Sequence, residues 1–127
     1  LPGSEAFTRH AARDTRIDMG VLKRKFGPFP TVAHDQNVLW YRLYRSVAGD
    51  AAVTHVHRKY LFTRDYAVLS FVLMVTLGAS SFWTFPSHST AWIYLSLLAL
   101  QYVVVRQAAN NNGIRLVTTV LALKATD

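Results

Sequence analysis

The sequence predicts an all-α membrane protein: a two-helix transmembrane hairpin, preceded by cytoplasmic or interfacial amphipathic helices and followed by a short amphipathic C-terminal helix. The first observation is a stretch of 40 residues, 66–105, that contains no Asp, Glu, Lys or Arg. At about 1.5 Å per helical residue, such a stretch crosses a hydrocarbon core of about 30 Å twice. The second observation is the distribution of charge, because residues 1–65 carry a net +5 and residues 106–127 a net +2.

This charge distribution also predicts an orientation. Basic residues follow and precede the apolar stretch, whereas the turn around Pro86 has none. Short basic segments stay on the cytoplasmic side of a membrane. We therefore expect both termini on the cytoplasmic or matrix side of a bacterial or organellar inner membrane. A pI near 10.2 also suits nucleic acid, but cations placed beside an apolar hairpin favour lipids as partners and no nucleic acid.

Residues 1–30 form a polar and basic arm with a Pro-Gly turn. Ser4 and Gly20 could cap and stop a helix over residues 5–19, or the arm could be extended and become ordered only against a partner. The basic run Lys23, Arg24 and Lys25 precedes a rigid turn at residues 27–30. Its cations suit lipid phosphates, and a solvated charged loop is the alternative.

Residues 31–65 are predicted to form interfacial amphipathic helices. Asp35 and Gly49 bound the first, over residues 36–47, and Asp50 caps a second that either continues into the membrane or breaks at residues 63–65. Trp and Tyr beside Arg are typical of a helix at the headgroup level, and packing on a soluble partner is the alternative. The anchoring residues expected here are Trp40, Tyr41, Arg42, Tyr44, Arg45, Arg58 and Lys59.

Residues 66–109 are predicted to form the transmembrane hairpin, with spans of about 66–85 and 90–107. Pro86 ends the first span, and Ser89 or Thr90 caps the second. Trp83 and Trp92 belong to an aromatic belt at this turn. Small and hydroxyl side chains permit close helix contacts, either with another membrane helix or within the hairpin. The contact residues expected are Thr76, Gly78, Ser80 and Ser81.

Residues 110–127 are predicted to be a short amphipathic tail. The run Asn110 to Gly113 predicts a helix end, because Asn and Gly tolerate left-handed backbone conformations. A new short helix is then expected over residues 114–125, with a strand less favoured.

Few residues indicate chemistry. The chain has no cysteine, neither predicted span contains His, and His55 and His57 do not share a helix face. No Asp, Glu, Lys or Arg lies within residues 66–105 for a proton relay, and no spacing of acids or nucleophiles indicates a hydrolase. We therefore expect no catalytic residue, no metal and no cofactor bound by this chain alone, and the sequence leaves open whether cofactors lie at subunit interfaces.

These observations favour a non-catalytic accessory or scaffolding subunit of a larger integral membrane complex, with other membrane subunits as partners. The cytoplasmic segments contain few apolar residues, so we expect them to form no core of their own and the arm to lie on a partner. The alternative is a homo-oligomeric two-span membrane effector or pore, in which Ser70, Thr76 and Ser80 would have to supply a polar wall.

Overall fold

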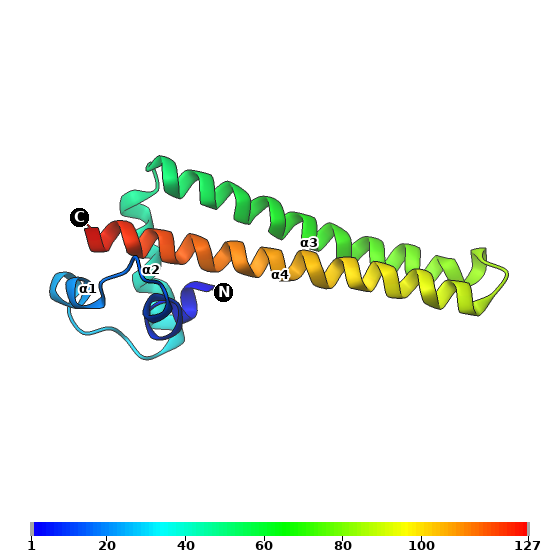
Figure 1. The fold of residues 1–127 in the computed structure, drawn as a ribbon, viewed down its shortest axis with the longest axis horizontal. Helices are drawn as coiled ribbons and strands as arrows, with labels where there is room; N and C mark the ends of the chain where they lie inside the picture. Colours follow the sequence, from blue (N-terminus) through cyan, green and yellow to red (C-terminus); the bar gives the residue numbers. More distant parts are fainter. Residues whose placement is uncertain (1, 127) are drawn as a thin grey trace. The chain divides into compact units, whose positions relative to one another are not determined.

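The protein was analysed as a computed structural model, which describes residues 2–126, and all regular structure in that range is helical (Figure 1). The elements group into two compact units. Residues 2–60 and 111–126 form the terminal unit, and residues 61–110 form the hairpin unit. The helices are η1 (Pro2–Glu5), η2 (Ala6–His10), η3 (Ala11–Arg13), α1 (Met19–Phe26), α2 (Ala33–Val47), α3 (Ala51–Thr84) and α4 (His88–Thr126).

The arm folds differently from both predictions. Instead of one helix over residues 5–19 or a mostly extended arm, residues 2–13 form three short 3-10 and π turns, and α1 begins only at Met19. Asp18 sets this start, because its Oδ1 accepts the Gly20 amide at 2.9 Å and the Val21 amide at 3.2 Å. Gly20 therefore lies inside a helix that it was expected to stop. The helix ends at Gly27, whose φ of +79° favours glycine.

The basic run lies in the last turn of α1 rather than in a loop. Cations there offset the negative end of the helix dipole. Lys25 also donates through Nζ to the carbonyl oxygen of Lys124 at 3.1 Å. A local stabilising role of the run is thus visible within the terminal unit.

α2 begins one turn earlier than predicted, at Ala33. Asp35 was expected to cap it, but lies within its first turn, and no side chain caps the helix at Val32. The predicted cap at Asp50 is confirmed, because its Oδ1 accepts the Ala52 amide at 2.8 Å.

The terminal unit has an apolar core of its own, so the expectation that these segments are too sparsely apolar is wrong. The arm supplies Phe7, which stacks on Phe29 with ring centroids 4.7 Å apart. The reason for the error is the C-terminal part of α4, which adds aliphatic side chains that are distant in sequence. The buried core residues are Ala6, Phe7, Ala11, Ile17, Leu22, Leu43, Val53, Leu116, Val117, Val120 and Leu121.

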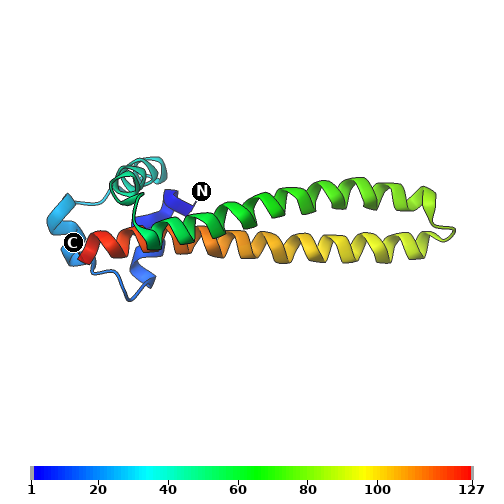
Figure 2. The ribbon, with the colours of Figure 1, turned by 90° about the horizontal axis from the view of Figure 1, so that it is seen from above.

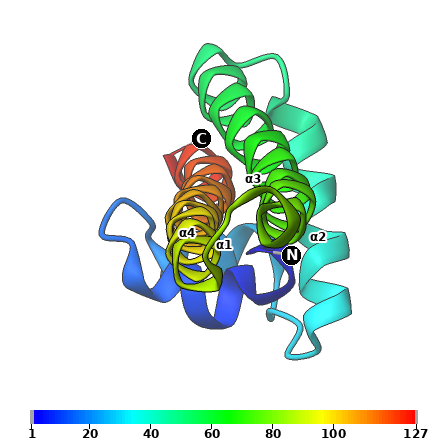
Figure 3. The ribbon, with the colours of Figure 1, turned by 90° about the vertical axis from the view of Figure 1, so that its right-hand side faces the viewer.

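In the hairpin unit, α3 and α4 run antiparallel and side by side in all three views (Figures 1, 2 and 3). α3 is continuous through residues 63–65, so the alternative of a break there is not realised. The break at Pro86 is confirmed, since α3 ends at Thr84 and α4 begins at His88. Ser89 and Thr90 therefore lie inside α4 and do not cap it.

The predicted helix end at Asn110–Gly113 is wrong. α4 continues through all four residues to Thr126, so the tail is the end of a long helix rather than a separate short one. Gly113 is buried in the terminal unit, where the following residues of α4 contribute to the core. Burial of this apolar stripe outweighs the weak helix propensity of the Asn-Gly run.

Candidate functional site

The outer face of the hairpin unit is its most distinctive surface, because it is apolar. Trp83 is 85% exposed and Phe62 71% exposed, and large aliphatic side chains project from α3 and α4 alike. The exposed large apolar residues of this unit are Phe62, Tyr66, Val68, Leu69, Phe71, Val72, Leu73, Val75, Leu77, Trp83, Trp92, Ile93, Leu97, Leu100, Val103 and Val104. α3 and α4 are both long and apolar enough to cross a membrane.

The inner face of the hairpin unit is built from small residues. A Cβ placed on Gly78 would lie 2.5 Å from Leu95 Cδ1, so the absence of a side chain lets α4 approach α3 closely. Ser81 is buried beside it and donates through Oγ to the Gly78 carbonyl oxygen. Ala91 and Ser70 are also buried. The close packing of two helices thus depends on side chains that occupy little space.

The four residues predicted to make helix contacts divide between these faces. Gly78 and Ser81 face the interior, whereas Thr76 and Ser80 are exposed. Thr76 Oγ1 donates to the Val72 carbonyl oxygen at 2.9 Å, and Ser80 Oγ donates to that of Leu77 at 3.1 Å. Each exposed hydroxyl is therefore satisfied by its own helix and adds little polarity to the outer face.

Aromatic pairs join the two helices near the turn. The rings of Phe82 and Trp92 meet edge to face with centroids 5.2 Å apart, and those of Phe85 and Tyr94 do so at 5.5 Å. Trp92 is nevertheless largely exposed, as is Trp83. Both predicted aromatic anchors therefore present their rings outward at the turn end of the unit.

In the terminal unit, two of the predicted anchors have structural roles. The Trp40 indole donates through Nε1 to the Val117 carbonyl oxygen at 3.2 Å and stacks on Tyr44. The Tyr44 hydroxyl lies 2.9 Å from His57 Nδ1. The exposed predicted anchors are Lys23, Arg24, Lys25, Tyr41, Arg42, Arg45, Arg58 and Lys59.

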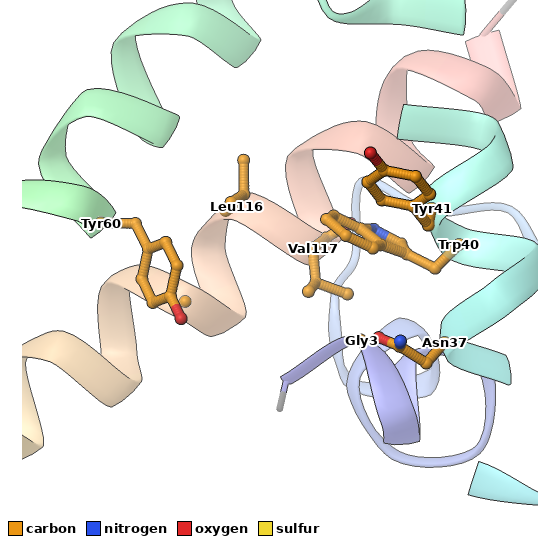
Figure 4. Close-up of a pocket in the computed structure, with 8 residues that line it drawn as sticks. Gly3, Asn37, Trp40, Tyr41, Tyr60, Leu116 and Val117 are labelled. Carbon is orange, nitrogen blue, oxygen red and sulfur yellow. The ribbon is translucent and has the colours of Figure 1, made fainter. Parts of the chain in front are cut away.

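Trp40 also borders a pocket of about 180 Å³ in the terminal unit (Figure 4). Trp40 and Tyr41 of α2 line one side, and Leu116 and Val117 of α4 lie between them and Tyr60. The lining is mostly apolar, with the Asn37 amide as a polar group at its edge. The pocket can hold a small apolar group but assembles no acid, base or nucleophile.

Sequence reasoning missed the polar interactions that join the arm to the rest of the terminal unit. Gln36 is buried, and its Oε1 accepts the amides of Phe7 at 3.2 Å and Thr8 at 3.4 Å. Arg16 forms a bidentate pair with Asp14 and donates to Thr118 Oγ1 at 3.3 Å. Nothing in the local sequence indicates the contact with Thr118, which lies 102 residues away.

These contacts shift the titration of the arm. The hydrogen bond from Arg16 lowers the pKa of Asp14 to about 2, and the same pairing raises the pKa of Arg16. Burial lowers the pKa of His10, which disfavours its charged form. Among residues 2–126, no three His, Cys, Asp or Glu side chains lie together as metal ligands would.

Comparisons with protein-family models, with curated proteins and with solved structures found no match for this chain.

Proposed function

We propose that this chain is a non-catalytic accessory subunit of a larger integral membrane complex, anchored by the hairpin of residues 66–109. The observation that carries the proposal is the apolar outer face of the hairpin unit. A soluble monomer rarely exposes an apolar surface that covers two helices. Lipid or other membrane helices would cover it, and the helical hydrogen bonds along α3 and α4 satisfy backbone groups within each helix, as a bilayer requires.

Membrane insertion is tested by extracting membranes of expressing cells with alkaline carbonate. The chain is expected to stay in the membrane pellet. Leu97→Lys places a charge on the outer face at a cost of about 2.5–3.5 kcal/mol for a central position, and should move part of the chain to the soluble fraction. Asn110→Lys, outside the uncharged stretch, is the matched control. Release of the unaltered chain by carbonate would contradict insertion.

The orientation is tested by cysteine labelling, which the cysteine-free sequence makes simple. Ser87→Cys in the turn and Ser46→Cys at the end of α2 should react with an impermeant maleimide from opposite sides of a sealed membrane. If both termini lie on the cytoplasmic or matrix side, a maleimide added outside should react with Ser46→Cys only after the membrane has been permeabilised. Labelling of both positions from the same side of an intact membrane would exclude a spanning hairpin.

Assembly is tested by measuring the mass of the complex after mild solubilisation. A fixed set of different chains supports an accessory subunit. Many copies of this chain alone support the alternative, a homo-oligomeric effector or pore. The pore has less support, because Ser70 is buried and the Thr76 and Ser80 hydroxyls are bonded to their own helix, so no polar wall remains.

The contact with partner helices is proposed to include Thr76 and Ser80 on the outer face. The double substitution Thr76→Leu and Ser80→Leu keeps the surface apolar but prevents close approach. It should weaken assembly by about 1 kcal/mol, roughly fivefold, without changing carbonate resistance. Val75→Leu, at a neighbouring exposed position, should leave assembly unchanged; equal weakening by Val75→Leu would refute this contact.

A further inference from the structure

The terminal unit contains a second hollow, of about 370 Å³, that the proposed function does not use. It lies between residues 10–16 of the arm and residues 111–118 of α4. Three guanidinium groups line it: Arg13 and Arg16 from the arm, and Arg115 from α4. Asp14 is the one acidic side chain in the lining, so these four groups carry a net charge of +2.

Arg16 is held in a fixed position in this hollow. Its Nε donates to Asp14 Oδ1 at 3.0 Å, and its terminal NH2 nitrogen donates to Asp14 Oδ2 at 2.7 Å and to Thr118 Oγ1 at 3.3 Å. Within residues 2–126, its other terminal nitrogen, NH1, makes no hydrogen bond. Because Asp14 and Thr118 fix one edge of this guanidinium, the N–H groups on its other edge point in a defined direction.

Arg13 and Arg115 contribute positive charge that the described part of the chain does not neutralise. Both side chains are exposed, and no hydrogen bond or ion pair joins either to any of residues 2–126. They come from positions 102 residues apart in sequence and border the same hollow. Positive charges gathered in a concave site raise the local concentration of anions.

The remaining polar groups also suit an anion. His10 also lines the hollow, and its ring can donate a hydrogen bond in its neutral form as well as in its charged form. The side chain of Asn111 borders the site as well. Asp14 is already engaged by Arg16, which leaves Arg13 and Arg115 to the ligand.

We propose that this hollow binds a phosphate group, which Arg13, Arg16 and Arg115 hold from the arm and from α4. Guanidinium groups match the planar arrangement of phosphate oxygens and form bidentate hydrogen bonds with them. The phosphate could belong to a lipid headgroup or be free in solution, and the two sources are separated by the choice of probe.

The test uses the full chain purified in a detergent without phosphate. One arm titrates inorganic phosphate by calorimetry. The other measures retention of dioleoyl phosphatidylglycerol by native mass spectrometry, with dioleoylglycerol as the matched lipid that lacks phosphate. Binding of inorganic phosphate identifies a free ligand, and preference for the phospholipid over dioleoylglycerol identifies a headgroup.

The decisive variant is Arg13→Gln with Arg115→Gln, because neither side chain supports the fold through a bond. About tenfold weaker binding is expected for each guanidinium removed, roughly 100-fold together. The double substitution Arg13→Lys and Arg115→Lys keeps the positive charge but removes the planar guanidinium that binds two oxygens at once, and should weaken binding about tenfold. This variant also serves if the glutamines disturb folding, as checked by circular dichroism.

The matched control is Arg9→Gln with Arg106→Gln, which removes two exposed arginines that lie outside the hollow and are not among the expected lipid anchors. It should weaken binding less than threefold. The proposal is overturned if neither probe binds the unaltered chain, or if the control weakens binding as much as the hollow variant does.

Discussion

The terminal unit and the hairpin unit place the same kinds of side chain in opposite positions. In the terminal unit, Phe7, Leu22 and Val120 are inside and the cations are outside. In the hairpin unit, Gly78 and Ser81 are inside, whereas Trp83 and Leu97 are outside. The first arrangement suits water and the second suits lipid, so one short chain carries the patterns of two solvents.

Variants of the two units can be compared in a form of the protein that has a single tryptophan. Replacing Trp83 and Trp92 by Phe leaves Trp40 as the single tryptophan, and its packing against α4 makes its fluorescence report on the terminal unit. Urea titrations of this background give the free energy of unfolding used below.

The largest difference is expected for truncation of a phenylalanine. Phe7→Ala should lower the free energy of unfolding of the terminal unit by about 3–5 kcal/mol, because the ring is 2% exposed and stacks on Phe29. Phe62→Ala, at a 71% exposed position of the hairpin unit, should change it by less than about 0.5 kcal/mol. Equal losses would remove the contrast between the units.

A smaller loss is expected when the buried amide is removed. Gln36→Ala leaves the amides of Phe7 and Thr8 without their acceptor, which should cost about 1–3 kcal/mol per unsatisfied buried group. Only the Phe7 amide bond is fully buried, so the lower half of that range is expected. His34→Ala, an exposed position on the same helix, should have no measurable effect, and a similar loss there would point to helix propensity instead.

In the hairpin unit, the cost of filling the close contact at Gly78 should grow with the volume of the new side chain. Gly78→Ile should destabilise the hairpin by about 1–3 kcal/mol, because its side chain would collide with Leu95. Gly78→Ala should cost less than about 1 kcal/mol, since the Leu95 methyl group can turn away and alanine favours the helix. Loss of helix on titration with dodecyl sulfate measures both, with Ala79→Ile on the exposed face as the control.

The smallest effect concerns pH. Since the pKa of Asp14 is lowered to about 2, its carboxylate adds stability that is complete above its unfolded pKa of about 3.9 and is lost as the pH falls toward 2. Asp14→Asn should therefore cost about 0.5–1 kcal/mol at pH 7 and almost nothing at pH 2. A cost that stays the same across this range would show that the ion pair is not its source.

The features that the sequence predicts well are those with local causes. Pro86 cannot continue a helix, Asp50 supplies a nearby cap, and the 40 uncharged residues require two long apolar helices. The features it does not predict depend on distant partners. Phe7 and Ile17 resemble isolated apolar residues in a polar arm, and only contact with the end of α4 makes them a core.

Distant contacts also explain why the sequence did not predict the continuous helix at Asn110–Gly113 or the arginine-lined hollow. Asn110–Gly113 has the composition of a helix end, but the stripe that follows is buried and keeps the helix intact. The hollow of Arg13, Arg16 and Arg115 has no sequence signature, because its two walls are about a hundred residues apart. The sizes and charges of the residues were enough to predict the hairpin, whereas the core and the hollow of the terminal unit can be recognised only in the folded chain.

The core of the terminal unit joins residues that precede the hairpin in sequence to residues that follow it, and this imposes an order on its folding during biosynthesis. Phe7 and Leu22 are synthesised early, but Val117, Val120 and Leu121 are synthesised only after the whole hairpin. A nascent chain that has emerged only as far as the hairpin lacks one wall of this core, so folding of the unit has to wait until residues 116–121 have been synthesised. Premature termination just after residue 110 would therefore expose the arm to proteolysis while leaving the hairpin sequence whole.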